Sequence, residues 1–264
     1  GLSIIPRAAG TSLAGQCVGT GIVVDISRMN KILEVNVEES WVKVQPGVVR
    51  DELNAFLKPL GLYFGPNTST ANRCMMAGMV GNNSCGTTSI VYGSTRDHTM
   101  ELDVVLSDGS EVKFGTVDKD TFEIKRKKDT LEGQIYQHLF EELSNTDLQS
   151  SIRKEFPKPS IHRRNTGYAV DFLLESEVFT NEGGALNICN RLCGSEGTLA
   201  FTTGIKLHVD PLPPAKDVVL CAHFGSMNEA MKAVVLAMEH KPSACELMDD
   251  TILQMSKQNI TQLK

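Results

Sequence analysis

The chain has 264 residues, of which 41% are hydrophobic and 22% are charged, so it can bury a real core and is neither a disordered nor a fibrous protein. Its 26 Lys and Arg residues are outnumbered by 32 Asp and Glu residues, and the net charge of −6 argues against a nucleic-acid partner. No apolar run approaches the roughly 18 residues of a membrane span, so we expect no membrane span.

The seven cysteines are odd in number and irregularly spaced, and no Cys-x-x-Cys pair occurs. This pattern favours neither a disulfide framework nor a zinc site. We therefore expect no metal in this chain and a reducing, cytoplasmic location. A peripheral contact with a membrane, through an unidentified electron acceptor, stays open.

Short β-like runs alternate with glycine-rich loops in the first hundred residues, which predicts an α+β fold. After a short strand at the start of the chain, the clearest strands are residues 22–25, 32–37 and 41–44. Residues 49–57 place apolar side chains at helical spacing, so one amphipathic helix is expected there.

The middle of the chain contains a predicted β-hairpin. Residues 101–106 and 111–114 flank an Asp-Gly pair at 108–109, whose positive φ angles would suit a tight turn. A charged helical stretch is expected over residues 130–156. Residues 199–209 then alternate as a long strand with one apolar face.

Prolines at positions 211, 213 and 214 read as a linker, so we divide the chain into residues 1–210 and residues 211–264. In the second part we expect a strand at 218–224, a helix at 227–239 and a strand at 244–248, as at the start of a ferredoxin-like α+β cap. The last predicted helix has an apolar face that nothing later in the sequence would cover. A fragment of a longer protein is the economical interpretation.

Three separated segments are rich in glycine and in small or hydroxyl side chains: residues 6–15, residues 65–70 with 77–86 and 92–93, and residues 194–201. Consecutive amides in the first loop could form an anion-binding nest for a phosphate. An ordinary glycine turn would explain that loop alone, and neither a Walker loop nor the Gly-x-Gly-x-x-Gly of dinucleotide folds is present. Together the three loops fit one long ligand that is touched at several points.

In this order the three segments resemble the flavin domain of the vanillyl-alcohol oxidase superfamily, in its branch of FAD-linked 2-hydroxy-acid dehydrogenases and oxidases. The resemblance covers residues 1 to about 210. It implies a PCMH-type fold in which two α+β subdomains hold an extended FAD. It also implies oxidation of a small 2-hydroxy acid, of the D-lactate, glycolate or D-2-hydroxyglutarate type, to the 2-oxo acid by hydride transfer to flavin.

The resemblance further implies which residues line the cofactor. Around the pyrophosphate it places Pro6, Arg7, Ala8, Ala9, Gly10, Thr11, Ser12, Gly15 and Gln16. Along the flavin and ribityl region it places Pro66, Ser69, Gly78, Asn82, Ser84 and Gly86. Along the nucleotide half it places Glu196, Gly197, Ala200 and Phe201.

The chain departs from the family in ways that shape these expectations. Members that tether FAD covalently often carry a histidine in the first loop, where this chain has Thr11 and Ser12, so noncovalent FAD is expected. The family's first strands and most of its substrate cap are missing, so the chain alone is expected to be inactive. Large members continue into an iron–sulfur region, and such a cluster would belong to a longer parent protein because no cysteine group here could hold it.

The basic run at 162–164 permits two interpretations. Arg163 and Arg164 could bind a substrate carboxylate, because guanidinium groups match carboxylates bidentately. The simpler interpretation is a solvated turn, or a structural pairing with Asp171 or Glu175. Likewise Cys85 could be a reactive thiol near the flavin, although a small apolar filler is the simpler role.

We assign no catalytic residue, because the resemblance places the acid–base and metal-binding groups largely on the cap. Two other functions stay open. A flavin-dependent reductase of a peptidoglycan precursor shares this fold and would use NADPH. A flavin-binding module without catalysis would be favoured if the full-length gene lacked a complete cap.

Overall fold

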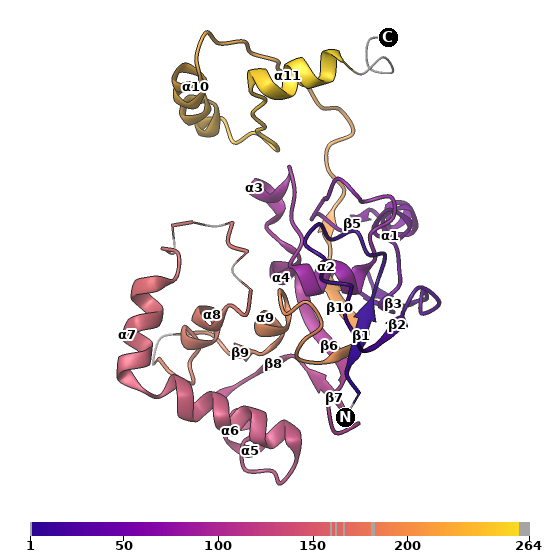
Figure 1. Ribbon diagram of the computed structural model, residues 1–264, viewed down its shortest axis with the longest axis vertical. Helices are drawn as coiled ribbons and strands as arrows, with labels where there is room; N and C mark the ends of the chain where they lie inside the picture. Colours follow the sequence, from indigo (N-terminus) through magenta and orange to yellow (C-terminus); the bar gives the residue numbers. More distant parts are fainter. Residues whose placement is uncertain (1, 159, 162, 166, 181–182, 259–264) are drawn as a thin grey trace.

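The computed structural model describes residues 2–158, 160–161, 163–165, 167–180 and 183–258. The predicted α+β class is confirmed, since helices and strands alternate along the whole body (Figure 1). No helix in the described ranges is long and apolar enough to cross a bilayer.

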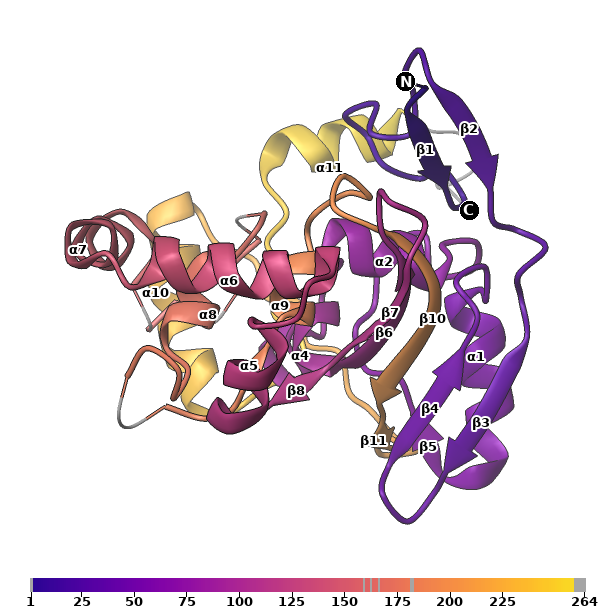
Figure 2. The same cartoon turned by 90° about the horizontal axis from the view of Figure 1, so that it is seen from below.

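A five-stranded antiparallel sheet forms the centre of the body (Figure 2). Its strands, in spatial order, are β3 (Ile32–Asn36), β4 (Trp41–Val44), β10 (Phe201–His208), β6 (Thr99–Val105) and β7 (Glu111–Phe114). The middle strand, β10, comes late in the chain. The third glycine-rich loop leads into β10, so the sheet itself brings that loop back to the first half of the sequence.

Alternation along these strands separates a core face from a solvent face. Val42, Leu102 and Leu207 are fully buried on the core face. On the other face the Lys43 ammonium lies 2.6 Å from a carboxylate oxygen of Asp103. The alternation that predicted the strand at residues 199–209 is therefore the one that buries its apolar face in the core.

Three pairs of short strands complete the sheet structure. They are β1 (Ile4–Arg7) with β2 (Ile22–Asp25), β5 (Leu62–Tyr63) with β11 (Asp210–Pro211), and β8 (Thr116–Val117) with β9 (Leu186–Asn187). The first pair is parallel and the other two are antiparallel. Parallel pairing of β1 and β2 makes the first glycine-rich loop a crossover that begins and ends at this small sheet.

The helices are mostly short, and α5, α6 and α7 gather on one side of the sheet (Figure 1). Their bounds are α1 (Arg50–Leu57), followed by a 3₁₀ turn (Lys58–Leu60), α2 (Met76–Asn82), α3 (Ser89–Tyr92), α4 (Thr95–His98), α5 (Lys119–Lys125), α6 (Leu131–Leu143), α7 (Thr146–Glu155), α8 (Val170–Leu174), α9 (Cys189–Leu192), α10 (Met227–Glu239) and α11 (Asp250–Lys257).

Two local predictions need refinement. The helical stretch over residues 130–156 is two helices, because the Asn145 side chain accepts hydrogen bonds from the amides of Asp147 and Leu148 and starts α7. The hairpin between β6 and β7 is confirmed, but only Gly109 has a positive φ, of +85°. Asp108 instead supports the turn with its side-chain carboxylate, which accepts a hydrogen bond from the Ser110 amide.

The segment after residue 211 departs further from the prediction. The helix at 227–239 is confirmed as α10, whereas the strands expected at 218–224 and 244–248 are wrong for this structure. Val218 and Leu220 are 95% and 88% exposed. A strand exists only through hydrogen bonds to a neighbouring strand, and neither segment has one within the described chain. Figure 1 shows α10 and α11 above the body, joined to it by the segment that follows β11.

The predicted domain boundary after residue 210 stays a prediction. In the structure, strand pairing with the first part of the chain extends one residue beyond this boundary, because Pro211 pairs with Leu62 in the β11–β5 ladder. The Leu212 amide also donates to the Gly61 carbonyl.

Tyr136 on α6 offers a test of the packing. Its ring lies edge-on to Phe122, burial raises the pKa of its hydroxyl, and that hydroxyl has no hydrogen-bond partner among the described residues. Tyr136→Phe is therefore expected to leave the free energy of unfolding unchanged or to raise it by about 1 kcal/mol, because an unsatisfied buried group is removed. Urea unfolding measures the change.

Tyr63→Phe is the matched control. The Tyr63 hydroxyl accepts a 2.8 Å hydrogen bond from the Arg50 guanidinium. Its removal should therefore lower the free energy of unfolding by about 1 kcal/mol. Equal losses for Tyr136→Phe and Tyr63→Phe would contradict the description of the Tyr136 hydroxyl.

Candidate functional site

The first glycine-rich loop leaves β1 and exposes bare backbone. Gly10 and Gly15 have φ angles of +66° and +78°, a region that side chains disfavour. A Cβ atom on Gly10 would lie 3.2 Å from a terminal nitrogen of Arg7. Glycine here keeps the loop bent beneath that guanidinium and leaves its amides uncovered.

Helix α2 supplies a second wall. Met76, Met79 and Val80 are buried in the core and fix how the helix is turned. Gly78 then meets the first loop, since a Cβ atom there would lie 3.1 Å from the Ala8 Cβ. The small residues of α2 thus allow the first loop to approach its backbone.

The third loop closes against both of the others. Its Gly194 and Glu196 amides donate to the carbonyls of Val80 and Gly81 at the end of α2, over 3.0 and 2.9 Å. Gly197 has a φ of +76°, and a Cβ atom there would overlap the Pro6 ring at 2.5 Å. Contacts between all three loops therefore depend on glycine backbone.

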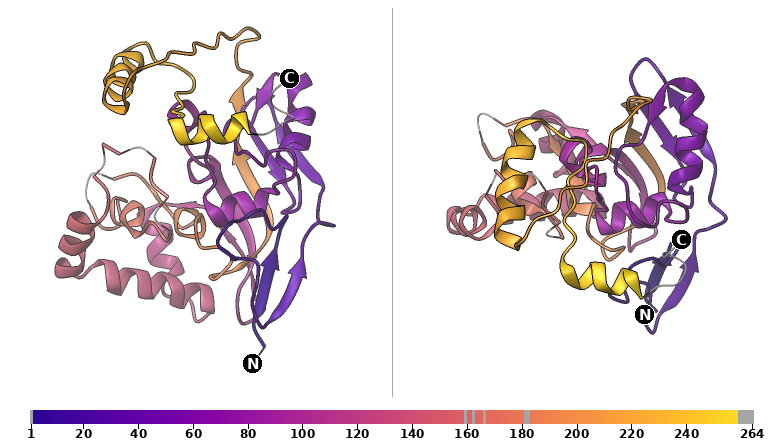
Figure 3. Two further views of the ribbon diagram at one scale, coloured as in Figure 1. Left: turned by 45° about the horizontal axis from the view of Figure 1, so that its top comes forward. Right: turned by 90° about the horizontal axis from the view of Figure 1, so that it is seen from above.

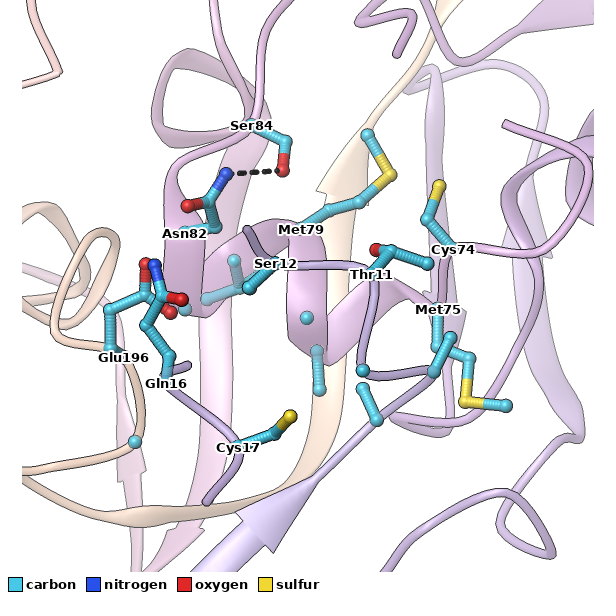
Figure 4. Close-up of a pocket in the computed structure, with 18 of the residues that line it drawn as sticks. Thr11, Ser12, Gln16, Cys17, Cys74, Met75, Met79, Asn82, Ser84 and Glu196 are labelled. Carbon is cyan, nitrogen blue, oxygen red and sulfur yellow. Dashed lines mark hydrogen bonds between the residues drawn. The ribbon is translucent and has the colours of Figure 1, made fainter. Parts of the chain in front are cut away.

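The three loops surround one cavity of about 510 Å³, within the usual size of ligand-binding clefts. Figure 4 shows Thr11, Asn82 and Glu196, one from each segment, around it. Predicted residues that line this cavity are Pro6, Ala8, Ala9, Gly10, Thr11, Ser12, Gln16, Ser69, Gly78, Asn82, Ser84, Arg163, Glu196, Gly197 and Ala200.

Other lining residues were not predicted. Cys17 and Met75 lie close to glycine-rich residues and Ile26 directly follows β2, and none of the three carries a signal of its own. Asn165 lines the cavity beside Arg163, and its place in the sequence, directly after the two arginines, was the only available hint. Arg7, Gly15 and Phe201 were predicted to line the site and only flank the cavity.

Pro66 and Gly86 were also predicted as cofactor residues, but they hold the second loop rather than face the cavity. The buried Arg50 guanidinium donates to the Pro66 carbonyl over 3.2 Å. A Cβ atom on Gly86 would fall 1.4 Å from the Asn67 carbonyl oxygen. A glycine required by backbone packing, such as Gly86, has the same sequence signature as one that admits a ligand.

Arg163 and Arg164 have different surroundings in the structure. Arg164 forms a 2.5 Å ion pair with the buried Asp171 and lies over the Phe172 ring. This is the structural pairing with Asp171 that the sequence suggested as an alternative to substrate binding. Arg163 lines the cavity. His162 of the same run lies outside the described residues. Arg164 is therefore not placed to meet a ligand in this cavity.

Arg96 is a structural residue that the sequence did not reveal. Its buried guanidinium donates to the carbonyls of Asn190, Gly167 and Cys193, over 2.9, 2.8 and 2.6 Å. Burial lowers the pKa of Arg96. By binding carbonyls from two segments, Arg96 ties the segment after α7 to the loop that carries Glu196.

Charged side chains are scarce in the cavity. Among the described residues that line it, Glu196 and Arg163 are the only ones of the Asp, Glu, Lys, Arg or His types. Partial burial raises the pKa of Glu196, and the amide of the neighbouring Gln16 opposes the shift. Among the described residues, no three potential ligands gather as a metal site.

The raised pKa of Glu196 predicts a pH-dependent difference between the chain and Glu196→Gln. The folded state binds the Glu196 proton more tightly than the unfolded state does, so this side chain favours folding below its unfolded pKa of about 4.3. That contribution is lost as pH rises through the higher folded pKa.

Urea unfolding between pH 3.5 and 7 should therefore show the advantage of the parent chain over Glu196→Gln shrinking as pH rises. Glu111→Gln, an exposed carboxylate change outside the cavity, is the control and should give no such trend. A difference that grows with pH would contradict the burial of Glu196.

Comparison with known proteins agrees with this geometry. A family model described as FAD binding domain matches residues 1–115, and a model described as FAD linked oxidases, C-terminal domain, matches residues 213–263. The fold also resembles a solved alkyldihydroxyacetonephosphate synthase, with a TM-score of 0.56 at 18% identity, over 91% of this chain and 33% of that protein. At that identity the likeness concerns the fold alone.

Relatives named D-2-hydroxyglutarate dehydrogenase match almost the whole chain. The one from Pseudomonas putida is 38% identical over 98% of this chain and 25% of its own length, and the one from Escherichia coli is 34% identical over the same shares. Glycolate oxidase subunit GlcD of Bacillus subtilis is 35% identical over 42% of this chain and 24% of its own length. The chain thus spans about a quarter of the length of these curated relatives.

Proposed function

The chain belongs to the FAD-linked oxidases, and from this premise we propose that it holds the FAD of an enzyme that oxidises a 2-hydroxy acid to the 2-oxo acid. The observation that carries the proposal is the convergence of three glycine-dependent loops on one cavity with few charged side chains. D-2-hydroxyglutarate is the first substrate to test, because relatives that match 98% of the chain carry that name.

The residues that are present fit this cofactor. Backbone amides of the first loop, bent at Gly10, would hold the pyrophosphate, since bare amides suit an anion and add no competing charge. Asn82 and Ser84 would face the flavin and ribityl part, and Gly197 and Ala200 the nucleotide part. FAD, when bound, accepts the hydride of the substrate carbon. The chain's own residues bind and orient the cofactor.

Noncovalent attachment is part of the proposal. Thr11 and Ser12 line the cavity where tethered relatives often have a histidine, and a hydroxyl side chain is not the usual attachment point. Acid precipitation of the FAD-loaded protein should leave all of the yellow colour in the supernatant. Colour that stays in the pellet would contradict noncovalent binding.

The proposed reaction is tested on the full-length gene product under anaerobic conditions. D-2-hydroxyglutarate, D-lactate and glycolate are added separately, and loss of the flavin absorbance is followed by stopped flow. At least one acid should bleach the flavin. Bleaching by NADPH with none by the hydroxy acids would instead favour a reductase, and no bleaching by either would favour a flavin-binding module without catalysis.

A further inference from the structure

Arg163 lines the cavity, and the Nε–H of its guanidinium already makes a hydrogen bond within the protein. Its Nε donates to the Cys85 sulfur over 3.2 Å. Asn165 Nδ2 donates to the same sulfur over 3.0 Å. Cys85 follows α2 and lines the cavity too, so a single sulfur atom gathers two donors from the segment between α7 and α8.

This contact fixes which part of Arg163 can meet a ligand. With Nε bound to sulfur, the two terminal amino groups remain, and neither has a partner within the described chain. Two parallel N–H groups at the end of a guanidinium match the two oxygens of a carboxylate. The neighbouring Arg164 cannot play this part, because Asp171 binds it.

The position of Arg163 separates it from the loop assigned to the pyrophosphate. Ala8 of that loop packs against Gly78, one helical turn before the end of α2, whereas Cys85 lies beyond that end. Among the described lining residues Arg163 is also the only Lys, Arg or His. The connection from α7 to α8 runs on the side of the body that faces α10 (Figures 1 and 3).

We propose that Arg163 binds a carboxylate of the 2-hydroxy acid through its terminal amino groups, and that Cys85 is the positioning residue that orients it. This inference rests on the proposed function. It assigns recognition of the substrate's acid group to the flavin-holding part of the chain and gives the Cys85 sulfur a defined role as hydrogen-bond acceptor.

The test uses the FAD-loaded full-length gene product and the variants Arg163→Gln, Cys85→Ala and Cys85→Ser. Arg163→Gln should raise KM for the hydroxy acid about 10- to 100-fold, the usual worth of charge-assisted hydrogen bonds, with a smaller change in kcat. Cys85→Ala should raise KM about 3- to 10-fold, and Cys85→Ser should recover part of that loss because its hydroxyl oxygen also accepts a hydrogen bond. Arg153→Gln, an exposed arginine on α7 outside the cavity, is the control.

A second measurement does not depend on turnover. Calorimetric titration of FAD-loaded protein with 2-oxoglutarate should show binding that Arg163→Gln weakens by a similar factor, while bound flavin per chain stays constant. Unchanged KM and unchanged 2-oxoglutarate affinity in Arg163→Gln, or absence of binding to the parent protein, would overturn the proposal. Loss of flavin instead of substrate affinity would also overturn it and assign Arg163 to a cofactor phosphate. If no hydroxy acid bleaches the parent flavin, the proposed function fails, and the titration still decides the role of Arg163.

Discussion

Gly10→Leu is expected to weaken FAD binding by more than about 100-fold, comparable to losing two hydrogen bonds to a charged group. Gly10 has a φ of +66° at the edge of the cavity, so a leucine side chain would fill the space in front of the loop amides. The left-handed backbone should also cost about 1–2 kcal/mol of folding stability. Flavin fluorescence titration measures the affinity, and urea unfolding measures the stability.

Gly109→Leu is the control that distinguishes the effect of backbone strain from the effect of filling the cavity. Gly109 has a φ of +85°, lies in the turn between β6 and β7, and has open space where a Cβ atom would stand. This variant should lose similar stability and keep its FAD affinity. An undiminished affinity in Gly10→Leu would contradict the assignment of the first loop to the pyrophosphate.

Gly86→Ala is expected to lower the free energy of unfolding by about 3 kcal/mol or more, at the upper end of the range for overpacking. The new methyl group would fall 1.4 Å from the Asn67 carbonyl oxygen, so the backbone of the second loop would have to move. Thr88, which donates to the Gly65 carbonyl over 3.2 Å, links the same two segments. FAD affinity should fall as well, because Ser69 and Ser84 line the cavity from these segments.

Gly184→Ala is the matched control for that change. Gly184 has open space around its Cα and a backbone conformation that alanine adopts. Urea unfolding should place this variant within about 0.5 kcal/mol of the parent chain. Equal stability of Gly86→Ala and Gly184→Ala would contradict the close packing of the second loop.

Local patterns in the sequence predicted much of the fold because the relevant forces are local. Alternation identified β10, and the apolar spacing of α1 identified that helix. The position of β10 between β4 and β6 could not be predicted in this way, since strand order depends on contacts between distant segments. The same reason explains the failure at residues 218–224, which have a strand-like composition but no neighbouring strand among the described residues.

The sequence likewise predicted only some of the residues of the candidate site. The first and second glycine-rich segments were noticed because their small residues are clustered, and the structure places Gly10 and Gly78 at the cavity. The helix α2 within the second segment was not predicted. Pro66 and Gly86 do not line the cavity, and for Gly86 the sequence does not reveal whether a glycine faces a ligand or another backbone. Arg163 and Arg164 are adjacent and identical in kind, so only their tertiary contacts, with Cys85 and with Asp171, distinguish them.

The central claim is that one cavity, built from three loops, holds the FAD. A crystal structure of this chain with FAD tests it most directly. The pyrophosphate should lie within hydrogen-bonding distance of the amides of residues 9–12, with the cofactor extending along α2 between Gly78 and Gly197. FAD bound elsewhere, for example in the smaller cavity between α6 and the β6–β7 hairpin that His138 lines, would contradict it.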